Sequence, residues 1–397
     1  MAKRWYFAGF AASDGPEQLT LVADLTIANT VSDLIQGDVR EHLPLERIPL
    51  QGDVLGLGTT TSIDNGELTF LQDNASTSAI WRCVAHDGSI IKLSPGDGSG
   101  HFPYVCFTRD ASTLRRPVAI ESESLGPTEE APLQRLVAEA IAQGQRSGTL
   151  ESAPIYGVRM LTHWHELVIT VASKLCMGQQ RRNMKVAASE AGSSTAGQSI
   201  YDMLQHYRLA PQPTEKTNDP IRYLGRAMQW DCCGFFDTEP ELGRVTVPQQ
   251  GAHLHLHGCS TDLAYGGHLH HEHASTRLKQ LERLWLYPLQ SFSALGSDMA
   301  VEDLSFDNGM IRFRVVNAGE MDVSDVGVAV VINDRYSSRR YIRIPWLSAG
   351  DDEEFTLSLS LPSGKQLITV IADPEEIVIE AENRRNNNRL DLEVQIP

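Results

Sequence analysis

Seven of the thirteen histidines of this chain lie within residues 253–273, and their spacing constrains the local fold. In H-L-H-L-H (253–257) the histidines alternate with leucines, so on a β-strand all three point to one face. A ten-residue connection containing Ser, Thr, Asp and Gly-Gly leads to His268 and His270, again two residues apart. Folded as a hairpin, the segment gathers imidazoles from two neighbouring strands around one point. A zinc-like divalent metal favours that arrangement.

A histidine-rich segment can also be a solvated polar strand or a tract that binds metal non-specifically. The strict alternation with apolar residues argues against this, because such a tract needs no leucines on its other face. We therefore predict a specific metal site. Zinc is the expected metal, although the same ligands suit Fe, Ni or Cu. Cys259, two residues beyond the H-L-H-L-H run, is predicted to be a loop neighbour rather than a ligand.

Composition narrows the classes of partner. With 397 residues, a 41% apolar fraction and 21% charged residues, the chain has the composition of an ordinary globular protein of two or three domains. A net charge of −17 and the absence of a basic stripe argue against nucleic acid and anionic membranes. No apolar run is long enough to span a bilayer, and no signal peptide is recognisable. We expect a cytoplasmic protein that acts on a small molecule.

The six cysteines include no C-x-x-C pair and no small-domain disulfide pattern, so we predict reduced core residues. Strand patterns and turn signals dominate residues 20–110, and helical spacing predicts one helix at about 131–144, ending at Gly144. Two strands are expected next, I-Y-G-V-R-M-L and L-V-I-T-V-A. A partly ordered insertion at about 176–222, around one helix, and a short helix or strand through R-L-K-Q-L-E-R-L-W-L complete this part.

From about residue 298 the pattern changes to strands with turn signals every ten or so residues. Residues 298–397 carry 19 acidic and 10 basic residues and are predicted to form an immunoglobulin-like β-sandwich. The runs V-V-N-A-G, L-S-A-G-D and A-D-P-E-E-I-V-I-E-A-E-N resemble the CARDB family of immunoglobulin-like domains. The resemblance implies a spacing or interaction role, with a protein partner or a second copy of the chain, or a purely structural one.

Two motifs in residues 1–297 carry a second resemblance. The segment G-D-V-L-G-L-G-T-T-T-S-I-D-N-G-E-L-T-F-L (52–71), followed by W-R-C-V-A-H-D-G-S and H-F-P-Y-V-C-F-T, resembles the N-terminal signature of the acetolactate decarboxylases. The family's metal motif, roughly G-x-H-L-H-F, eight residues, then G-G-H, is similar to the histidine hairpin. The resemblance spans about residues 25–275. It implies a mainly β chain, with an α+β N-terminal region of mixed or antiparallel sheets before the sandwich.

Carried over residue by residue, the resemblance places the family's metal ligands on His255, His257 and His268. An alternative register uses His253 and His255 with a two-residue insertion. The glutamate of the family's D-G-E motif corresponds to Glu67, which is the implied catalytic residue. The alternative for this glutamate is an exposed turn position at the start of a strand.

The chain also departs from the family. An arginine is expected eleven residues beyond Arg159, where Thr170 stands, and Arg159 itself is predicted to lie on a strand surface. The family's C-terminal glutamate has no clear counterpart, and Glu272 and Glu302 are candidates. His270 and the additional H-W-H-E histidines, His163 and His165, are possible pocket residues. A turn is the favoured interpretation for H-W-H-E.

These features support three classes of function. The first is a metal-dependent decarboxylase, a carbon–carbon lyase that acts on acetolactate or a related 2-hydroxy-3-oxo acid through a metal-stabilised enediolate, with Glu67 moving protons. The second is a metalloenzyme that carries out other enolate chemistry, such as isomerisation or cyclisation, which the missing arginine favours. The third is a metal-binding interaction protein without catalysis.

Overall fold

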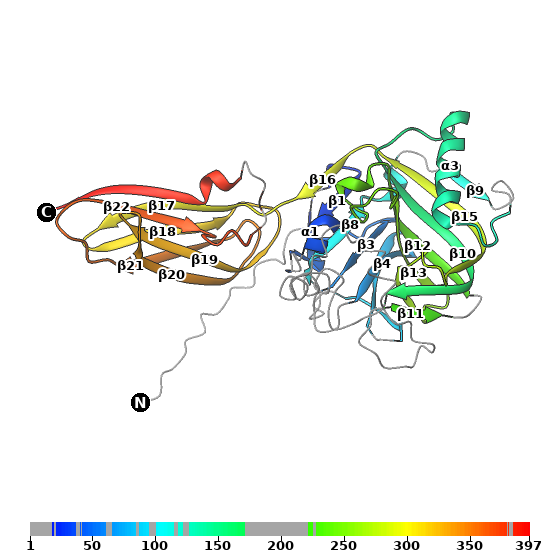
Figure 1. Cartoon of the computed structure of the whole chain (residues 1–397), viewed down its shortest axis with the longest axis horizontal. Coiled ribbons are helices and arrows are strands. Elements are labelled where there is room, and N and C mark those ends of the chain that lie inside the picture. Colours follow the sequence, from blue (N-terminus) through cyan, green and yellow to red (C-terminus); the bar gives the residue numbers. More distant parts are fainter. Residues whose placement is uncertain are drawn as a thin grey trace, which may run out of the picture.

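The computed structural model describes residues 18–397, except residues 20, 37–39, 41, 61–65, 85–86, 95–100, 115–117, 122–126, 171–220, 225–227, 379 and 381–383. Strands dominate the described residues, so the prediction of a mainly β chain is confirmed. Figure 1 shows two groups of strands, with β1–β16 in one and β17–β23 in the other. The insertion predicted at about 176–222, with its helix, lies outside the described residues except for its last two positions.

The first group contains two large sheets. One has the order β16-β1-β8-β3-β4-β5-β6. Its strands are β1 (Leu25–Ala28), β3 (Gly56–Thr59), β4 (Glu67–Asn74), β5 (Thr77–Cys83), β6 (Ile90–Lys92), β8 (Tyr104–Thr108) and β16 (Phe292–Leu295). The other has the order β12-β13-β14-β10-β15-β9. Its strands are β9 (Val118–Glu121), β10 (Ile155–Thr170), β12 (Met228–Asp237), β13 (Leu254–Ser260), β14 (Gly266–Leu269) and β15 (Arg277–Leu289).

Short elements complete this group. Strand β11 (Ile221–Leu224) pairs with β10, and β2 (Leu43–Pro44) pairs with β7 (His101–Phe102). The helical elements are α1 (Val31–Gln36), α3 (Leu133–Ser147), η1 (Leu45–Arg47), η2 (Ala111–Thr113) and η3 (Pro240–Leu242). Among the described helices, none combines the length and the apolar character needed to cross a membrane.

The two large sheets pack face to face around a common apolar core. This core joins Leu57 and Cys106 of the first sheet to Ile155, Phe235 and Leu289 of the second. Because side chains alternate between the two faces of a strand, each strand of the second sheet sends every other residue into this space. The inter-sheet space is therefore where polar residues of β4, β10 and β13 can meet.

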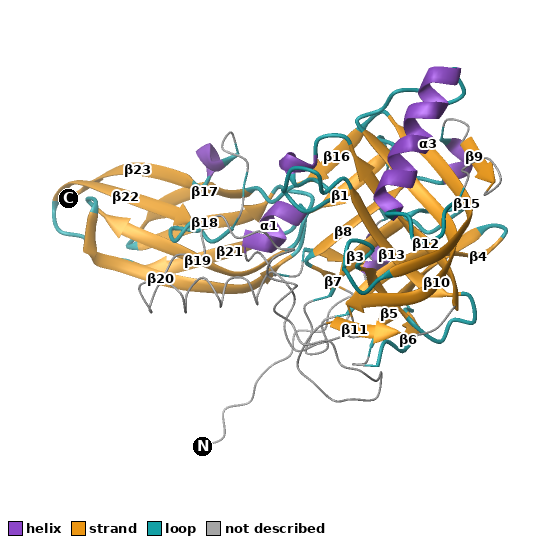
Figure 2. Cartoon of the chain, turned by 45° about the vertical axis from the view of Figure 1, so that its right-hand side comes forward, coloured by secondary structure: helices purple, strands orange, loops and turns teal. Residues whose placement is uncertain are grey.

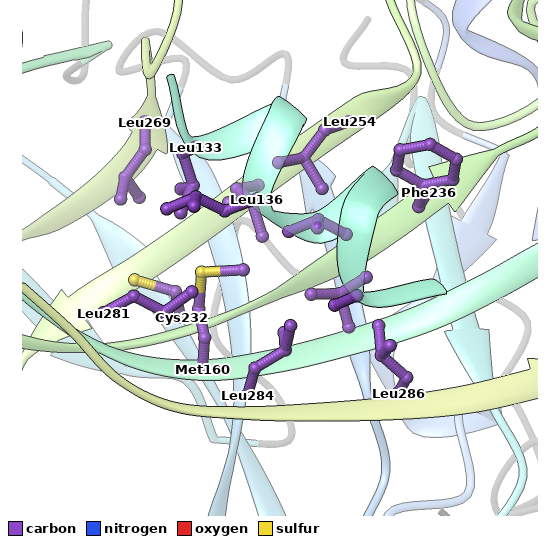
Figure 3. Packing of buried hydrophobic residues seen from close by; sticks show 14 of the residues in the cluster. Leu133, Leu136, Met160, Cys232, Phe236, Leu254, Leu269, Leu281, Leu284 and Leu286 are labelled. Atoms are coloured by element: carbon purple, nitrogen blue, oxygen red, sulfur yellow. The ribbon is translucent and has the colours of Figure 1, made fainter. Parts of the chain in front are cut away.

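Helix α3 covers the opposite face of the second sheet (Figure 2). Leu133 and Leu136 of the helix pack with Met160, Cys232 and Leu284, as Figure 3 shows. The helix was correctly predicted, but its predicted end at Gly144 is wrong. Gly144 lies inside the helix, where a Cβ would come within 2.7 Å of Leu150, so the glycine serves close packing rather than a turn. The helix ends instead at Gly148, whose φ of 71° is left-handed.

One further prediction is wrong in this sheet, and another that left two alternatives open is decided. The H-W-H-E segment is no turn: β10 runs unbroken from Ile155 to Thr170, with Trp164 1% exposed beneath α3. The R-L-K-Q-L-E-R-L-W-L segment, predicted as a short helix or a strand, is a strand within β15, so the strand alternative is confirmed. In both segments buried apolar residues face α3 while polar residues face the other side. In H-W-H-E these polar residues look in the sequence like the end of a strand, which is why a turn is expected there.

Strands β17–β23 form a two-sheet sandwich. One sheet has the order β17-β18-β21 and the other β20-β19-β22-β23. The strands are β17 (Met299–Asp307), β18 (Met310–Asn317), β19 (Val323–Ile332), β20 (Arg335–Leu347), β21 (Asp352–Ser358), β22 (Gly364–Ala372) and β23 (Arg389–Ile396), with η4 (Arg385–Asn387) before the last. Phe313, Val328 and Val370 belong to a core cluster between the two sheets. On this basis we propose 1–297 and 298–397 as the two domains of the chain.

Candidate metal centre

The β13–β14 hairpin positions three histidines. The antiparallel register pairs His257 directly with His268. On β13, Leu254 and Leu256 point into the core beneath α3, so His255 and His257 point into the inter-sheet space. The predicted hairpin is present, and its apolar positions anchor the strand so that its histidines face one point.

The three imidazoles approach each other closely. One nitrogen from each of His255, His257 and His268 lies within 4.8 Å of the others. His255 Nε2 is 3.0 Å from His268 Nδ1 and 3.2 Å from His257 Nε2. Three nitrogen ligands on one tetrahedral zinc ion, each about 2.0–2.1 Å from it, would be about 3.3 Å apart. Two of the three nitrogen–nitrogen separations therefore match such an ion, and the third pair lies within 4.8 Å.

Backbone carbonyls fix the tautomers of two of these rings. His255 Nδ1 lies 2.7 Å from the carbonyl oxygen of Val245, and His257 Nδ1 lies 2.7 Å from that of Leu68. A carbonyl oxygen can only accept, so both Nδ1 atoms donate and both Nε2 atoms present lone pairs. Two lone pairs 3.2 Å apart repel unless a cation lies between them. In protein metal sites, imidazole ligands commonly donate one ring N–H to a backbone carbonyl in this way, which leaves the other nitrogen facing the metal.

Burial keeps these rings neutral. It lowers the pKa of His255 to about 4, and the pKa values of His257 and His268 fall well below their usual range, mainly for the same reason. A neutral imidazole is the form that binds a metal. The triad is therefore ready to bind a cation at neutral pH without first losing protons.

Glu67 approaches the triad from the opposite sheet. It is the first residue of β4, and its carboxylate Oε2 lies 3.7 Å from His257 Nε2. Its side chain is only 12% exposed, and burial raises its pKa to about 8. The alternative of an exposed turn position is wrong. The neighbouring Leu68 carbonyl orients His257, so β4 supplies both a carboxyl group and a ring-orienting acceptor.

A second hydrogen-bonded group adjoins the triad. Thr170, which pairs with His268 in the sheet, has its Oγ1 2.7 Å from His270 Nε2. His270 Nδ1 lies 3.0 Å from Glu272 Oε1. Burial alone would raise the pKa of Glu272, but the hydrogen bond from His270 and the nearby His271 lower it to about 2. Where the family resemblance leads one to expect an arginine, the chain has a hydroxyl bound to an imidazole.

The remaining histidine candidates lie outside the triad. His253 stacks on Phe236, with ring centroids 5.2 Å apart, and its Nδ1 contacts the carbonyl oxygen of Asp237. These contacts do not favour the alternative register in which His253 and His255 are the ligands. His163 and His165, on β10, contact Glu282 at 3.2 Å and Glu129 at 3.0 Å instead.

Three non-histidine candidates are also placed differently from their predictions. Arg159 is not on a surface; its side chain is 17% exposed and ion-pairs with two aspartates between the sheets. Glu302 lies on β17 and pairs with Arg314, in the sandwich rather than at the triad. Cys259 belongs to β13 itself and not to a loop.

The described cysteines are free and buried, as predicted; Cys176 lies outside the described residues. Sequence reasoning missed the carbonyls of Leu68 and Val245. No side-chain pattern marks a backbone acceptor, so no sequence signal was available for them.

Comparisons with known proteins give a family for the sandwich. Residues 303–391 match the CARDB family model, which confirms that resemblance. A CARDB domain from Pyrococcus furiosus, solved in complex with di-metal ions, is 22% identical, with a TM-score of 0.22, and covers 25% of this chain and 94% of its own.

The chain is also similar in structure to acetolactate decarboxylases over part of its length. Those of Bacillus subtilis subspecies spizizenii and of Bacillus subtilis strain 168 are each 15% identical, with a TM-score of 0.42. They cover 68% of this chain, and 88% and 87% of their own chains. Among curated proteins none matches this chain. Membership of the decarboxylase family stays a prediction.

Proposed function

We propose that the chain is a metal-dependent carbon–carbon lyase that decarboxylates a small 2-hydroxy-3-oxo acid such as acetolactate. The observation that carries the proposal is the convergence of three neutral imidazoles and one carboxyl group at a single point between two sheets. A site with three histidine ligands keeps a position open for substrate, unlike a closed structural site. The motif resemblance at residues 52–71 and 253–268 supports the same reaction.

The proposed roles follow from position. His255, His257 and His268 would hold the metal, with zinc the expected ion and Fe, Ni or Cu suited to the same ligands. When bound, the ion supplies Lewis acidity toward the substrate's ketone oxygen. In the overall reaction the bond to the carboxylate carbon breaks, carbon dioxide leaves and the remaining carbon takes up one proton. Glu67, the carboxyl group beside His257, is placed to deliver that proton.

One observation favours a second candidate, an isomerase or cyclase that uses the same metal and Glu67. Position 170 carries a threonine whose hydroxyl is bound to His270. A neutral hydroxyl lacks the positive charge and the two parallel N–H donors with which an arginine guanidinium binds a carboxylate. A substrate without a carboxylate to expel would not need that cation.

The test is to incubate the purified full-length protein, with its metal content measured, with racemic acetolactate and to quantify acetoin and carbon dioxide. We expect acetoin from the unaltered protein and none from His257→Ala. The matched control is His163→Ala, a histidine of β10 bound to Glu282 outside the triad, which should leave the rate unchanged.

Each alternative outcome points to a different function. One equivalent of metal with no acetoin would overturn the decarboxylase and leave the isomerase or cyclase. Absence of metal would favour the interaction protein that binds through its CARDB domain.

A further inference from the structure

A second polar site lies in the inter-sheet space, apart from the histidines. A cavity of about 320 Å³ is lined by Asp53, Gln72, Arg159, Asp231, Trp285 and Tyr287, together with Leu161. Arg159 pairs across the sheet with Cys233, which pairs in turn with His257. The cavity is therefore two strand spacings, about 10 Å, from the metal triad.

Cys233 separates the two sites. Its side chain is fully buried and its thiol contacts the carbonyl oxygens of Gly56 and Phe70, at 3.0 and 3.2 Å. These contacts join the two sheets between Arg159 and His257. None of the triad histidines lines the cavity. The cavity and the histidine triad are thus two separate sites on the same face of the second sheet.

The charges in the cavity wall do not balance. The Arg159 guanidinium contacts Asp53 at 3.1 Å and Asp231 at 3.0 Å, and all three side chains are about one-fifth exposed. One cation between two carboxylates leaves an excess negative charge in a poorly solvated place. Burial, offset in part by Arg159, raises the pKa of Asp53, as do the neighbouring carboxylates of Asp110 and Asp231. A further cation would stabilise the ionised pair.

Polar groups in the wall also lack protein partners. Tyr287 is only 6% exposed, yet its hydroxyl makes no hydrogen bond to any residue that the structure describes. The Tyr287 side chain is thus buried while its hydroxyl opens to the cavity, the usual arrangement for an amphipathic tyrosine beside a binding site. The side chains of Trp285, which is part-buried, and of Gln72, which is exposed at the rim, make no hydrogen bond within the described part of the chain either. These groups are available to a ligand.

We propose that this cavity binds a small organic cation, an amine or a guanidinium compound with a short apolar body. The carboxylates of Asp53 and Asp231 would accept its N–H donors, and the aromatic side chains of Trp285 and Tyr287 would attract its charge and cover its carbons. The Tyr287 hydroxyl and the Gln72 amide would complete its hydrogen bonds. An anion would meet the excess negative charge, and a neutral molecule would leave it uncompensated. The proposal does not depend on the metal or on the lyase reaction.

The first experiment is a calorimetric titration of the full-length protein with putrescine, tyramine, choline and guanidinium. Neutral 1,4-butanediol and anionic succinate serve as matched probes. We expect at least one cation to bind with a one-to-one stoichiometry that survives in His257→Ala, and no binding of the diol or succinate. Failure of all four cations at millimolar concentration, equal binding of the diol, or saturation by Mg²⁺ alone would overturn the proposal.

The second experiment locates the site with two variants. Tyr287→Phe removes only the hydroxyl and should weaken binding of the cation by about 10- to 100-fold, the usual worth of one hydrogen bond to a charged group. Asp53→Asn removes the excess negative charge of the cavity and should weaken binding of the cation further than Tyr287→Phe does. Asp303→Asn, an exposed aspartate paired with Arg314 in the sandwich, is the matched control and should bind as the unaltered protein does. Unchanged affinity in both cavity variants would contradict the assignment.

Discussion

At the scale of single residues, the site depends on groups that hold the imidazoles as much as on the imidazoles themselves. The carbonyls of Leu68 and Val245 turn the Nε2 atoms of His257 and His255 toward one point. His257 is 1% exposed, so its ring has few alternative positions. The spacing of the histidines predicts which rings converge. The carbonyl partners come from segments distant from His257 or from an irregular loop, and no local pattern reveals them.

Glu67 can be tested separately from the three histidines proposed to bind the metal. Glu67→Gln keeps the size of the side chain and a hydrogen-bonding group but removes the ability to carry a proton. We expect bound metal to remain and kcat to fall by about 100- to 10,000-fold, the usual contribution of a general acid or base. Steady-state kinetics with metal analysis of the same sample checks this. An unchanged kcat would remove Glu67 from the mechanism.

At the scale of elements, close strand packing leaves little space between β12 and β13. A side chain at Gly234 would come within 1.9 Å of the backbone oxygen of His255 on the neighbouring strand. The sequence reveals the alternation of β13, and hence its face. It does not reveal that β10 continues through His163 and His165, because polar residues on the solvent side of a long strand resemble a turn.

Gly234→Ala should therefore disturb the strand that carries His255. We expect a lower thermal midpoint and reduced metal content in the same preparation, because the clash is with backbone that cannot move aside without breaking the ladder. Gly148→Asn is the control: its position is open and its φ of 71° suits asparagine. A normal midpoint and full metal content in Gly234→Ala would mean that β12 and β13 tolerate a wider separation.

At the scale of the whole molecule, the histidine triad and the sandwich core belong to different groups of strands. Phe313 and Val328 pack in a cluster of the sandwich, whereas His255 and His257 lie between the other two sheets. The strand alternation after residue 298 is regular enough for the sequence to predict the sandwich. How the two large sheets face each other depends on contacts between distant segments, which one sequence does not contain.

Removing the metal should therefore destabilise one part of the protein only. In calorimetry of the full-length chain we expect two thermal transitions. Removing the metal with a chelator should lower the midpoint temperature of only one of them. A ligand present at about 100 times its Kd stabilises the folded state by about 2.7 kcal/mol. Adding back one equivalent of zinc should return the midpoint temperature of that transition to its original value. If chelation lowered both transitions equally, the metal would act on the whole chain and the separation into two units would be wrong.

The central claim is that His255, His257 and His268 bind one metal ion. The most direct measurement is elemental analysis of the purified full-length protein and of single alanine variants at these three positions, with His163→Ala as the control. We predict about one equivalent of metal in the unaltered protein and in the control, and loss of most of it in each triad variant. Absence of metal from the unaltered protein after zinc is supplied, or full retention in His257→Ala, would contradict the account.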